Sequence, residues 1–195
     1  MDNEKKQSLL GMAEKYFQES PSHDRVHVMR TIEFARSLHK IYGGDFDLIE
    51  VAAIVHDIGR SNPGLHEIDS LRESVRLAEP ILRETGLTDD QISRVNQIVL
   101  EHDQPHVTPS TVEGKILKDA DWLDGFGARG ILRTIVWAIE SGQGVDGAIY
   151  RLKVKMPKRM EALTFPESRE FALREYEFVK EFLKRLEGGD DNGEM

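Results

Sequence analysis

Apolar residues recur every three or four positions along most of this chain, which is the period of amphipathic α-helices. We find no convincing alternation of apolar and polar residues of the kind that predicts strands. The pattern therefore predicts an all-α fold of roughly eight helices, without internal repeats or a dividing linker. The expected helical stretches are 3–19, 24–41, 45–58, 67–85, 88–103, 113–127, 128–142, 145–162 with an interruption at Pro157, and 164–187.

Several of these helices begin at residues that can cap a helix. Asp45 is a plausible N-cap for the helix 45–58, and Thr88 with Gln91 forms a capping box for the helix that follows. Thr164 with Glu167 is a second candidate pair, at the start of the last helix. The residues that follow this long helix, 188–195, are rich in Gly and Asp, and we expect a disordered tail there.

The expected helix 45–58 is apolar nearly all round, so we place it at the centre of the core. Its apolar run from Val51 to Val55 leads directly into His56 and Asp57. A buried carboxylate must be paired or bound to a metal, and a buried imidazole also needs partners. One interpretation is a histidine at the negative end of the helix with Asp57 paired to Arg60, and the other is a metal site.

The chain contains more His-Asp dipeptides than chance predicts. A random order of its residues gives roughly half of one such dipeptide. The three observed are His23-Asp24, His56-Asp57 and His102-Asp103. Only the middle pair ends a helix of core character, whereas the other two border loops where water can satisfy them. His23 is either a support for the site or exposed, and Asp24 is either a helix cap or a partner of a metal-bound histidine.

Two more candidate ligands lie on the inward faces of expected helices. His27 shares an apolar stripe with Thr31 and Phe34, and Asp121 lies beside the stripe of Ile116 and Ala120. Together with His56 and Asp57 they form a mixed nitrogen and oxygen site, which suits Mn, Fe, Co, Ni or Zn better than Ca. Four ligands leave octahedral positions open, as a catalytic metal requires.

Composition limits the classes of protein. With 195 residues and 39% hydrophobic content, the chain fits one globular domain, which we expect over residues 1–187. It has no cysteine, so disulfides and thiolate zinc sites are excluded, and the cytoplasm is the simplest location. We find neither a signal-peptide core nor a stretch apolar enough to cross a membrane. The net charge of −9 argues against a nucleic-acid polymer as partner, and the oligomeric state is not indicated.

The candidate ligands stand in segments that resemble a known family. The segments "HDRVHVMRT", "IVHDIGR" and "KDADWLDGFGARGILR" resemble the signature of the HD-domain superfamily of metal-dependent phosphohydrolases, in its small single-domain branch. Further similarity lies in "LHEIDS", "IVLEHDQ" and the last helix, so that it covers roughly residues 20–187. The resemblance implies an HD-type domain with His27, His56, Asp57 and Asp121 as metal ligands.

The resemblance also implies an activity, the hydrolysis of a phosphoester or phosphoanhydride bond in a small phosphorylated metabolite, with a nucleotide as the first choice. A metal-activated water is the expected nucleophile, and Asp57 is expected to orient or deprotonate it. His66 and His102 are expected to contact phosphate or act as general acid. Arg60 and Arg133 are candidates for phosphate binding through their guanidinium groups, with solvation of helix ends as the other interpretation.

The expected cofactor is one divalent ion, which is Mn, Fe, Co, Ni, Zn or Mg. A second ion is the alternative, but two-metal branches offer extra donors such as an adjacent second histidine, whereas His102 is followed by Asp103 and Gln104. Two other classes of function remain open. Some members of the superfamily are di-iron oxygenases, and an HD module that loses ligands can serve as a non-catalytic nucleotide or metal sensor.

Overall fold

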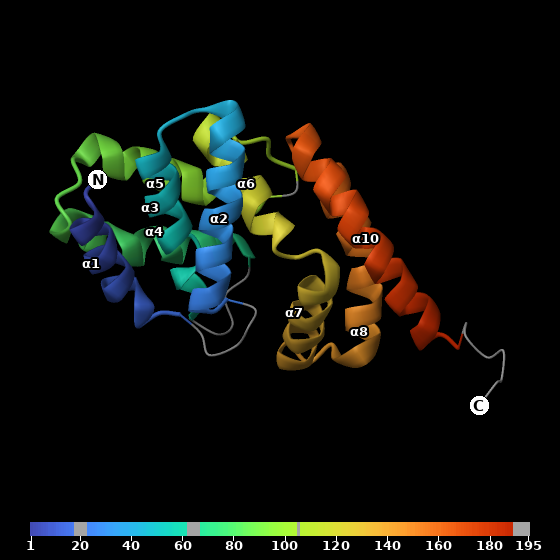
Figure 1. Cartoon of the computed structure of the whole chain (residues 1–195). Coiled ribbons are helices and arrows are strands. Elements are labelled where there is room, and N and C mark those ends of the chain that lie inside the picture. Colours follow the sequence, from blue (N-terminus) through green and yellow to red (C-terminus); the bar gives the residue numbers. More distant parts are fainter. Residues whose placement is uncertain (18–22, 62–66, 105, 189–195) are drawn as a thin grey trace. The chain divides into compact units, whose positions relative to one another are not determined.

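The computed structural model describes residues 1–17, 23–61, 67–104 and 106–188. All regular structure within these residues is helical and none of it is strand (Figure 1), so the all-α prediction is confirmed. The chain forms two compact units, Met1–Asp121 and Trp122–Met195. The single domain over residues 1–187 stays a prediction. Of the predicted disordered tail, residues 189–195 lie outside the described residues.

The first unit is built around helix α3. Helix α3 (Phe46–Val55) contacts four other helices, and every residue from Leu48 to Val55 is buried, so the predicted central helix is confirmed. The surrounding elements are α1 (Asn3–Glu14), α2 (Arg25–Tyr42), α4 (Glu67–Glu84), α5 (Asp89–His102) and most of α6 (Val112–Leu123). A short 3₁₀ turn, η1 (Ile58–Ser61), follows α3 and packs on α4.

Side-chain caps mark where several of these helices begin, including α2, α3 and α5. Asp24 caps α2 by accepting a hydrogen bond from the backbone amide of His27, 2.7 Å away. Asp45 accepts from the amides of the first turn of α3, as predicted. Thr88 and Gln91 form the predicted capping box of α5. The caps of α2 and α3 bear on the site, because they fix the starts of the helices that lead to His27 and His56.

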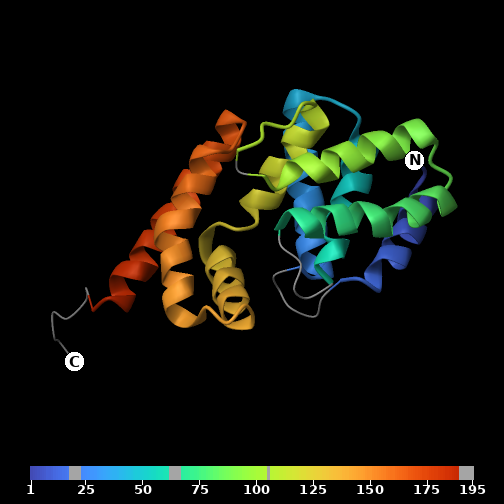
Figure 2. The same ribbon diagram turned by 180° about the vertical axis from the view of Figure 1, so that it is seen from behind.

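Helices α4 and α5 lie side by side in the first unit and are joined by a short turn at Gly86 (Figure 2). The loop from α5 to α6 is held by Lys118, which is buried although lysines are mostly exposed in proteins. Its ammonium donates to the backbone oxygens of Gln104 and Val107, at 3.3 and 2.8 Å. Burial lowers the pKa of Lys118, because the charged form is poorly solvated there.

This shift makes the stability contribution of Lys118 depend on pH. The folded-state pKa lies below the unfolded value, so the unfolded chain binds more protons between the two pKa values. We expect the free energy of unfolding of the wild type to rise, relative to that of Lys118→Met, as the pH increases from neutral towards the unfolded pKa. Urea denaturation of both proteins at several alkaline pH values measures this difference. A constant difference across that range contradicts the prediction.

The second unit contains α7 (Gly127–Glu140), α8 (Gly144–Tyr150), η2 (Arg151–Lys155), α9 (Met156–Glu161) and α10 (Pro166–Leu186). Helix α10 packs on α7 and α9, and α7 packs on α8. The predicted interruption near Pro157 is confirmed as a π-helical turn, η2, in which the amide of Met156 donates to the oxygen of Arg151. Proline lacks an amide hydrogen, which explains a locally altered bonding pattern at this point.

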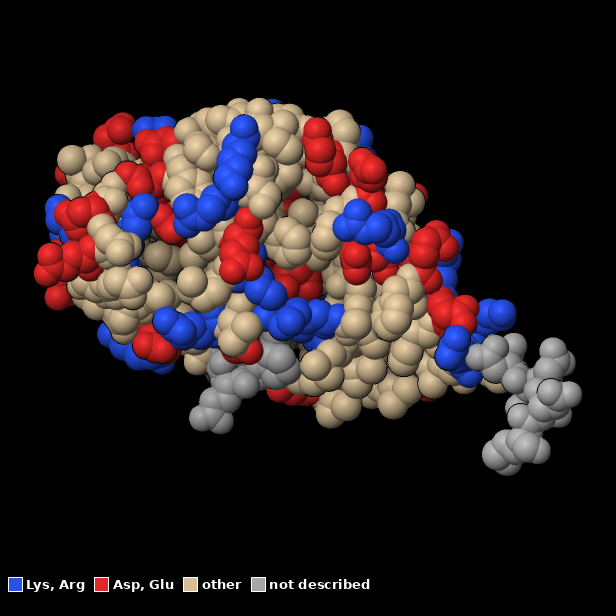
Figure 3. All heavy atoms as spheres, in the orientation of Figure 1, with Lys and Arg blue, Asp and Glu red and all other residues tan. Residues whose placement is uncertain are grey.

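The predicted start of the last helix is wrong by one residue. The N-cap of α10 is Phe165 rather than Thr164, and it makes no side-chain cap bond. Pro166 occupies the first turn, where its fixed φ angle suits a helix start. On the face drawn in Figure 3, basic and acidic side chains are interspersed among uncharged ones, and several basic side chains lie together near the lower middle. Among the described helices, none combines the length and apolar character that a membrane span requires.

Candidate metal centre

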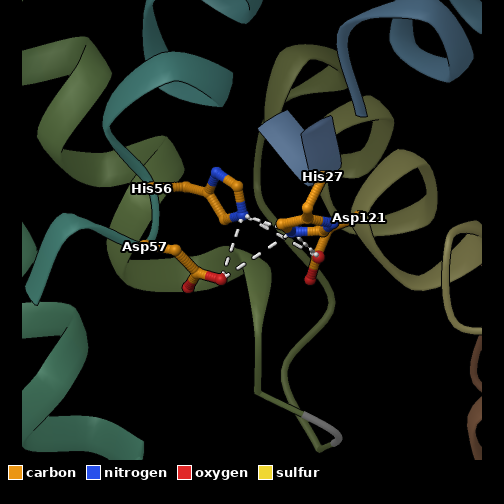
Figure 4. A group of neighbouring side chains, drawn as sticks. All are labelled: His27, His56, Asp57 and Asp121. Atoms are coloured by element: carbon orange, nitrogen blue, oxygen red, sulfur yellow. Dashed lines mark hydrogen bonds and ion pairs between the residues drawn. The ribbon is translucent and has the colours of Figure 1, made fainter. Parts of the chain in front are cut away.

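The four predicted ligands come together within the first unit. His27 lies in the first turn of α2, His56 and Asp57 directly follow α3, and Asp121 lies near the end of α6. Each offers one ligand atom, and these four atoms all lie within 4.8 Å of one another (Figure 4). We call these four residues the His/Asp cluster. Its members are separated by up to 94 positions in sequence, from 27 to 121, so only the tertiary fold unites them.

The spacing of the cluster fits a single cation. His27 Nε2 lies 3.3 Å from His56 Nε2 and 3.2 Å from Asp121 Oδ1. His56 Nε2 lies 3.3 Å from Asp57 Oδ2. Ligands at about 2.1 Å from one ion are separated from their neighbours by about 3.0–3.5 Å, in octahedral or tetrahedral geometry. The observed separations therefore leave room for one ion among the four atoms.

The protonation of His56 supports the same conclusion. Its Nδ1 lies 2.8 Å from the backbone oxygen of Ala53, and because a carbonyl only accepts, Nδ1 carries the hydrogen. In the neutral ring, Nε2 therefore presents a lone pair to His27 Nε2 and to two carboxylates. Without an ion, the two carboxylates favour a proton at this nitrogen, and a divalent cation would take the place of that proton. A backbone bond at the other ring nitrogen is typical of metal-bound histidines.

The electrostatics of the cluster favour added positive charge. Burial alone raises the pKa of Asp57, but Arg60, His56 and His23 outweigh it and hold that pKa well below its usual range. Burial likewise opposes a charge on His56, yet Asp57 and Asp121 raise its pKa to about 9. Burial also acts to raise the pKa of Asp121, but the hydrogen bond with His27 and the charge of His56 outweigh it and lower that pKa. Both carboxylates are therefore ionised at neutral pH, and the site attracts cations.

His102 also faces the cluster. It is fully buried, and its Nδ1 donates to the backbone oxygen of Val99 at 2.7 Å. Among the described residues its Nε2 has no hydrogen-bond partner, and this atom lies 4.0 Å from Asp121 Oδ2. Burial and the neighbouring His56 lower the pKa of His102. A neutral imidazole with an available nitrogen therefore points to the same space as the four ligands.

Residues of the outer two His-Asp dipeptides belong to the same site. His23 Nδ1 lies 2.7 Å from Asp57 Oδ2, so His23 contacts a predicted ligand. Asp103 accepts a hydrogen bond from Arg60 at 2.5 Å, and Arg60 also donates to Asp57. From the sequence, His23 was either a support for the site or exposed, and Asp103 was expected to border a loop where water can satisfy it. The excess of His-Asp dipeptides was the one signal that could have found both.

The remaining predicted site residues either lie outside the described residues or are not part of the His/Asp cluster. His66 lies outside the described residues, so its role stays a prediction. Arg133 lies in the second unit, where its Nη1 donates to Asp124 at 2.6 Å. Asp57 is paired with Arg60 and also belongs to the His/Asp cluster, and metal binding by Asp57 stays a prediction. Phosphate binding by Arg60 and Arg133 stays a prediction.

Comparison with known proteins identifies the family. The model of the HD domain matches residues 25–125, just over half of the chain and the segment that contains the whole cluster. The chain belongs to the HD domain family. Among curated relatives, the uncharacterized protein YpgQ of Bacillus subtilis (strain 168) is 29% identical over 178 residues, which cover 87% of this chain and 85% of YpgQ.

Solved structures of other proteins have the same fold. A crystal structure of B. subtilis YpgQ in complex with ADP has a TM-score of 0.74 at 24% identity, covering 96% of this chain and 98% of that one. A predicted HD superfamily hydrolase from an uncultured Thermotogales bacterium has a TM-score of 0.66 at 26% identity, covering 94% and 91%. Family membership and the His/Asp cluster support a metal-dependent hydrolase as the class of this HD protein.

Proposed function

We propose that this HD protein is a divalent-metal-dependent phosphohydrolase acting on a small phosphorylated metabolite, with a nucleotide as the first candidate. The observation that carries the proposal is the His/Asp cluster, in which two imidazoles and two carboxylates bring one ligand atom each within 4.8 Å. Such a donor set suits a first-row divalent ion and leaves positions open for water and substrate. Nucleotide as substrate is supported by the relative YpgQ, whose crystal structure holds ADP.

The residues of the cluster have distinct tasks in this proposal. His27, His56, Asp57 and Asp121 hold the ion, which supplies an acidified water and polarises a phosphoryl oxygen. Asp57 orients that water or accepts its proton. The Nε2 atom of His102, which has no hydrogen-bond partner among the described residues, takes up a proton when an anionic phosphate binds beside it. His102 then binds a phosphoryl oxygen or protonates the leaving oxygen. His66, Arg60 and Arg133 are further candidates for contacts with the phosphate.

The test is a substrate and metal panel. Nucleotides, alarmones and sugar phosphates are assayed for phosphate or pyrophosphate release with Mn²⁺, Co²⁺, Ni²⁺ and Mg²⁺. We expect hydrolysis that EDTA abolishes and that added metal restores. Activity unchanged by chelation contradicts the proposal. Oxygen consumption and iron content are measured on the same preparation, because turnover only with iron and oxygen indicates an oxygenase instead.

Replacement of His102 by Gln separates chemistry from metal binding. We expect Kd for the metal to be unchanged and kcat to fall by about 100-fold or more, which is the size of a general acid's contribution. Elemental analysis of wild type and variant, both purified without added metal, tests the prediction of one ion. One ion per chain in both proteins agrees with it. Two ions in the wild type and one in His102→Gln show that His102 is a ligand of a second metal.

A further inference from the structure

The two carboxylate oxygens of Asp57 have different surroundings. Oδ1 accepts a hydrogen bond from Arg60 Nε at 2.6 Å. Oδ2 faces His56 Nε2 at 3.3 Å and His27 Nε2 at 3.8 Å, and it also contacts His23. Only Oδ2 is therefore directed at the other ligand atoms. A hydrogen-bond donor that is held at Oδ1 therefore leaves Oδ2 as the oxygen that faces the other ligands.

Arg60 is held in place by a second carboxylate. Its Nη2 donates to Asp103 Oδ2 at 2.5 Å, so that one guanidinium bridges Asp57 in the turn after α3 and Asp103 at the end of α5. The side chains of all three are largely buried, with 18% of Arg60 and 7% of each aspartate exposed. Buried charged hydrogen bonds are strong and directional, and loss of one partner leaves an uncompensated charge.

We propose that Arg60 and Asp103 are positioning residues for the metal ligand Asp57. Asp103 orients the guanidinium, the guanidinium occupies Oδ1, and Asp57 is left to bind the ion through Oδ2 alone. The planar fork of arginine suits this bridge, because it offers donors in two fixed directions to two carboxylates. The inference deepens the proposed function and rests on it for the identity of the cluster as a metal site.

The two possible roles of Arg60, as a nearby positive charge and as a positioning residue for Asp57, predict opposite effects of its removal on metal affinity. If Arg60 acted only as a nearby positive charge, its removal would tighten the binding of a divalent cation. If it positions Asp57, removal weakens binding, because loss of an outer partner of a metal ligand typically costs about 10- to 100-fold in affinity. The effect of Asp103 then depends on Arg60, since Asp103 reaches the ligand only through the guanidinium.

The experiment is a double-mutant cycle read out as Mn²⁺ affinity. Competition with a chelator gives Kd for the full-length wild type, Arg60→Met, Asp103→Asn and the double variant. We expect Kd to rise about 10-fold or more in Arg60→Met. A smaller rise is expected in Asp103→Asn, with no further rise in the double variant. Arg60→Lys should recover part of the affinity. The control is Arg83→Met, which removes an exposed arginine paired with Glu79 and Asp89 and should leave Kd unchanged.

A second measurement needs no metal. In the ion-free protein, the Arg60 Nε–H hydrogen should give a slowly exchanging NMR signal, and Asp103→Asn should make its exchange faster. Tighter Mn²⁺ binding by Arg60→Met, additive effects in the cycle, or an unaltered Nε–H signal in Asp103→Asn each overturn the proposal. If Arg60→Met does not fold, Arg60→Lys and Asp103→Asn decide by the same criteria. If the wild type binds no divalent ion, the proposed function fails, while the NMR signal still tests the bridge.

Discussion

Replacement of Asp57 by Asn is expected to lower kcat/KM by about 1,000-fold or more, which corresponds to the several kcal/mol that a bound metal contributes to the transition state. Asn has nearly the same shape, and its side-chain oxygen can still accept the hydrogen bond from Arg60. It then turns an amide NH₂ group towards the position of Oδ2, between His23 and His56. The variant therefore keeps the fold but loses both the charge and the lone pair that face the cluster.

The measurement combines steady-state hydrolysis, with the substrate found in the panel, and Mn²⁺ affinity by chelator competition. We expect the loss of affinity to accompany the loss of activity, because the same oxygen serves both. Asp90→Asn is the matched control, since Asp90 is an exposed residue in the first turn of α5. Circular dichroism and thermal melting show whether the variant is folded. Activity within tenfold of the wild type, in a folded variant with normal metal affinity, contradicts the proposed role of Asp57.

The sequence was sufficient to predict the helical fold and to propose the ligand set, for one physical reason. A helix that buries every face cannot end in a histidine and an aspartate unless those groups have partners. The run from Val51 to Asp57 therefore predicts charged partners or a metal ion for His56 and Asp57. His27 could be added because the period of its helix indicates which face is inward. In the structure both histidines are fully buried, and their Nε2 atoms lie 3.3 Å apart.

The partners of the ligands could not be predicted in the same way. His23 and Asp103 lie next to helix ends, where periodicity no longer indicates which side chains face inward. Their contacts with Asp57 and Arg60 span 34 and 43 positions of sequence and depend on how α2, α3 and α5 pack. The number of His-Asp dipeptides was anomalous, but the sequence alone did not show that residues of all three pairs belong to one site.

Local contacts explain two features that the helical period does not predict, the burial of Lys118 and the start of the last helix. Lys118 lies on the inward side of α6, because two backbone oxygens of the preceding loop accept its hydrogen bonds and compensate for burial. The last helix begins at Pro166 because proline is well suited to the first turn, and this moves the cap from Thr164 to Phe165. In both cases the structure depends on a contact or residue that the spacing of apolar positions does not reveal, the loop oxygens for Lys118 and Pro166 for the last helix.

The close packing of η1 on α4 gives the largest stability effect that we expect. Gly59, two residues after Asp57, lies against the backbone of α4, and its amide donates to Ser74 Oγ at 2.9 Å. A Cβ atom at Gly59 would overlap the backbone of Ser70 and Ser74, which no side-chain rotation can relieve. We expect Gly59→Ala to lower the free energy of unfolding by about 3 kcal/mol or more, the upper range for overpacking.

Gly11→Ala is the matched substitution with the opposite expected sign. Gly11 is an exposed residue within α1, and a Cβ there meets no atom within 4 Å. Alanine should raise the free energy of unfolding by about 0.5–1 kcal/mol, because glycine is a poor helix former.

For a chain of this size, Tm should fall by roughly 6–12 °C in Gly59→Ala and rise by a few degrees in Gly11→Ala. Urea and thermal denaturation measure both. Equal and small changes at the two positions would show that η1 can move away from α4, and that the turn carrying Asp57 is less tightly held than the structure indicates.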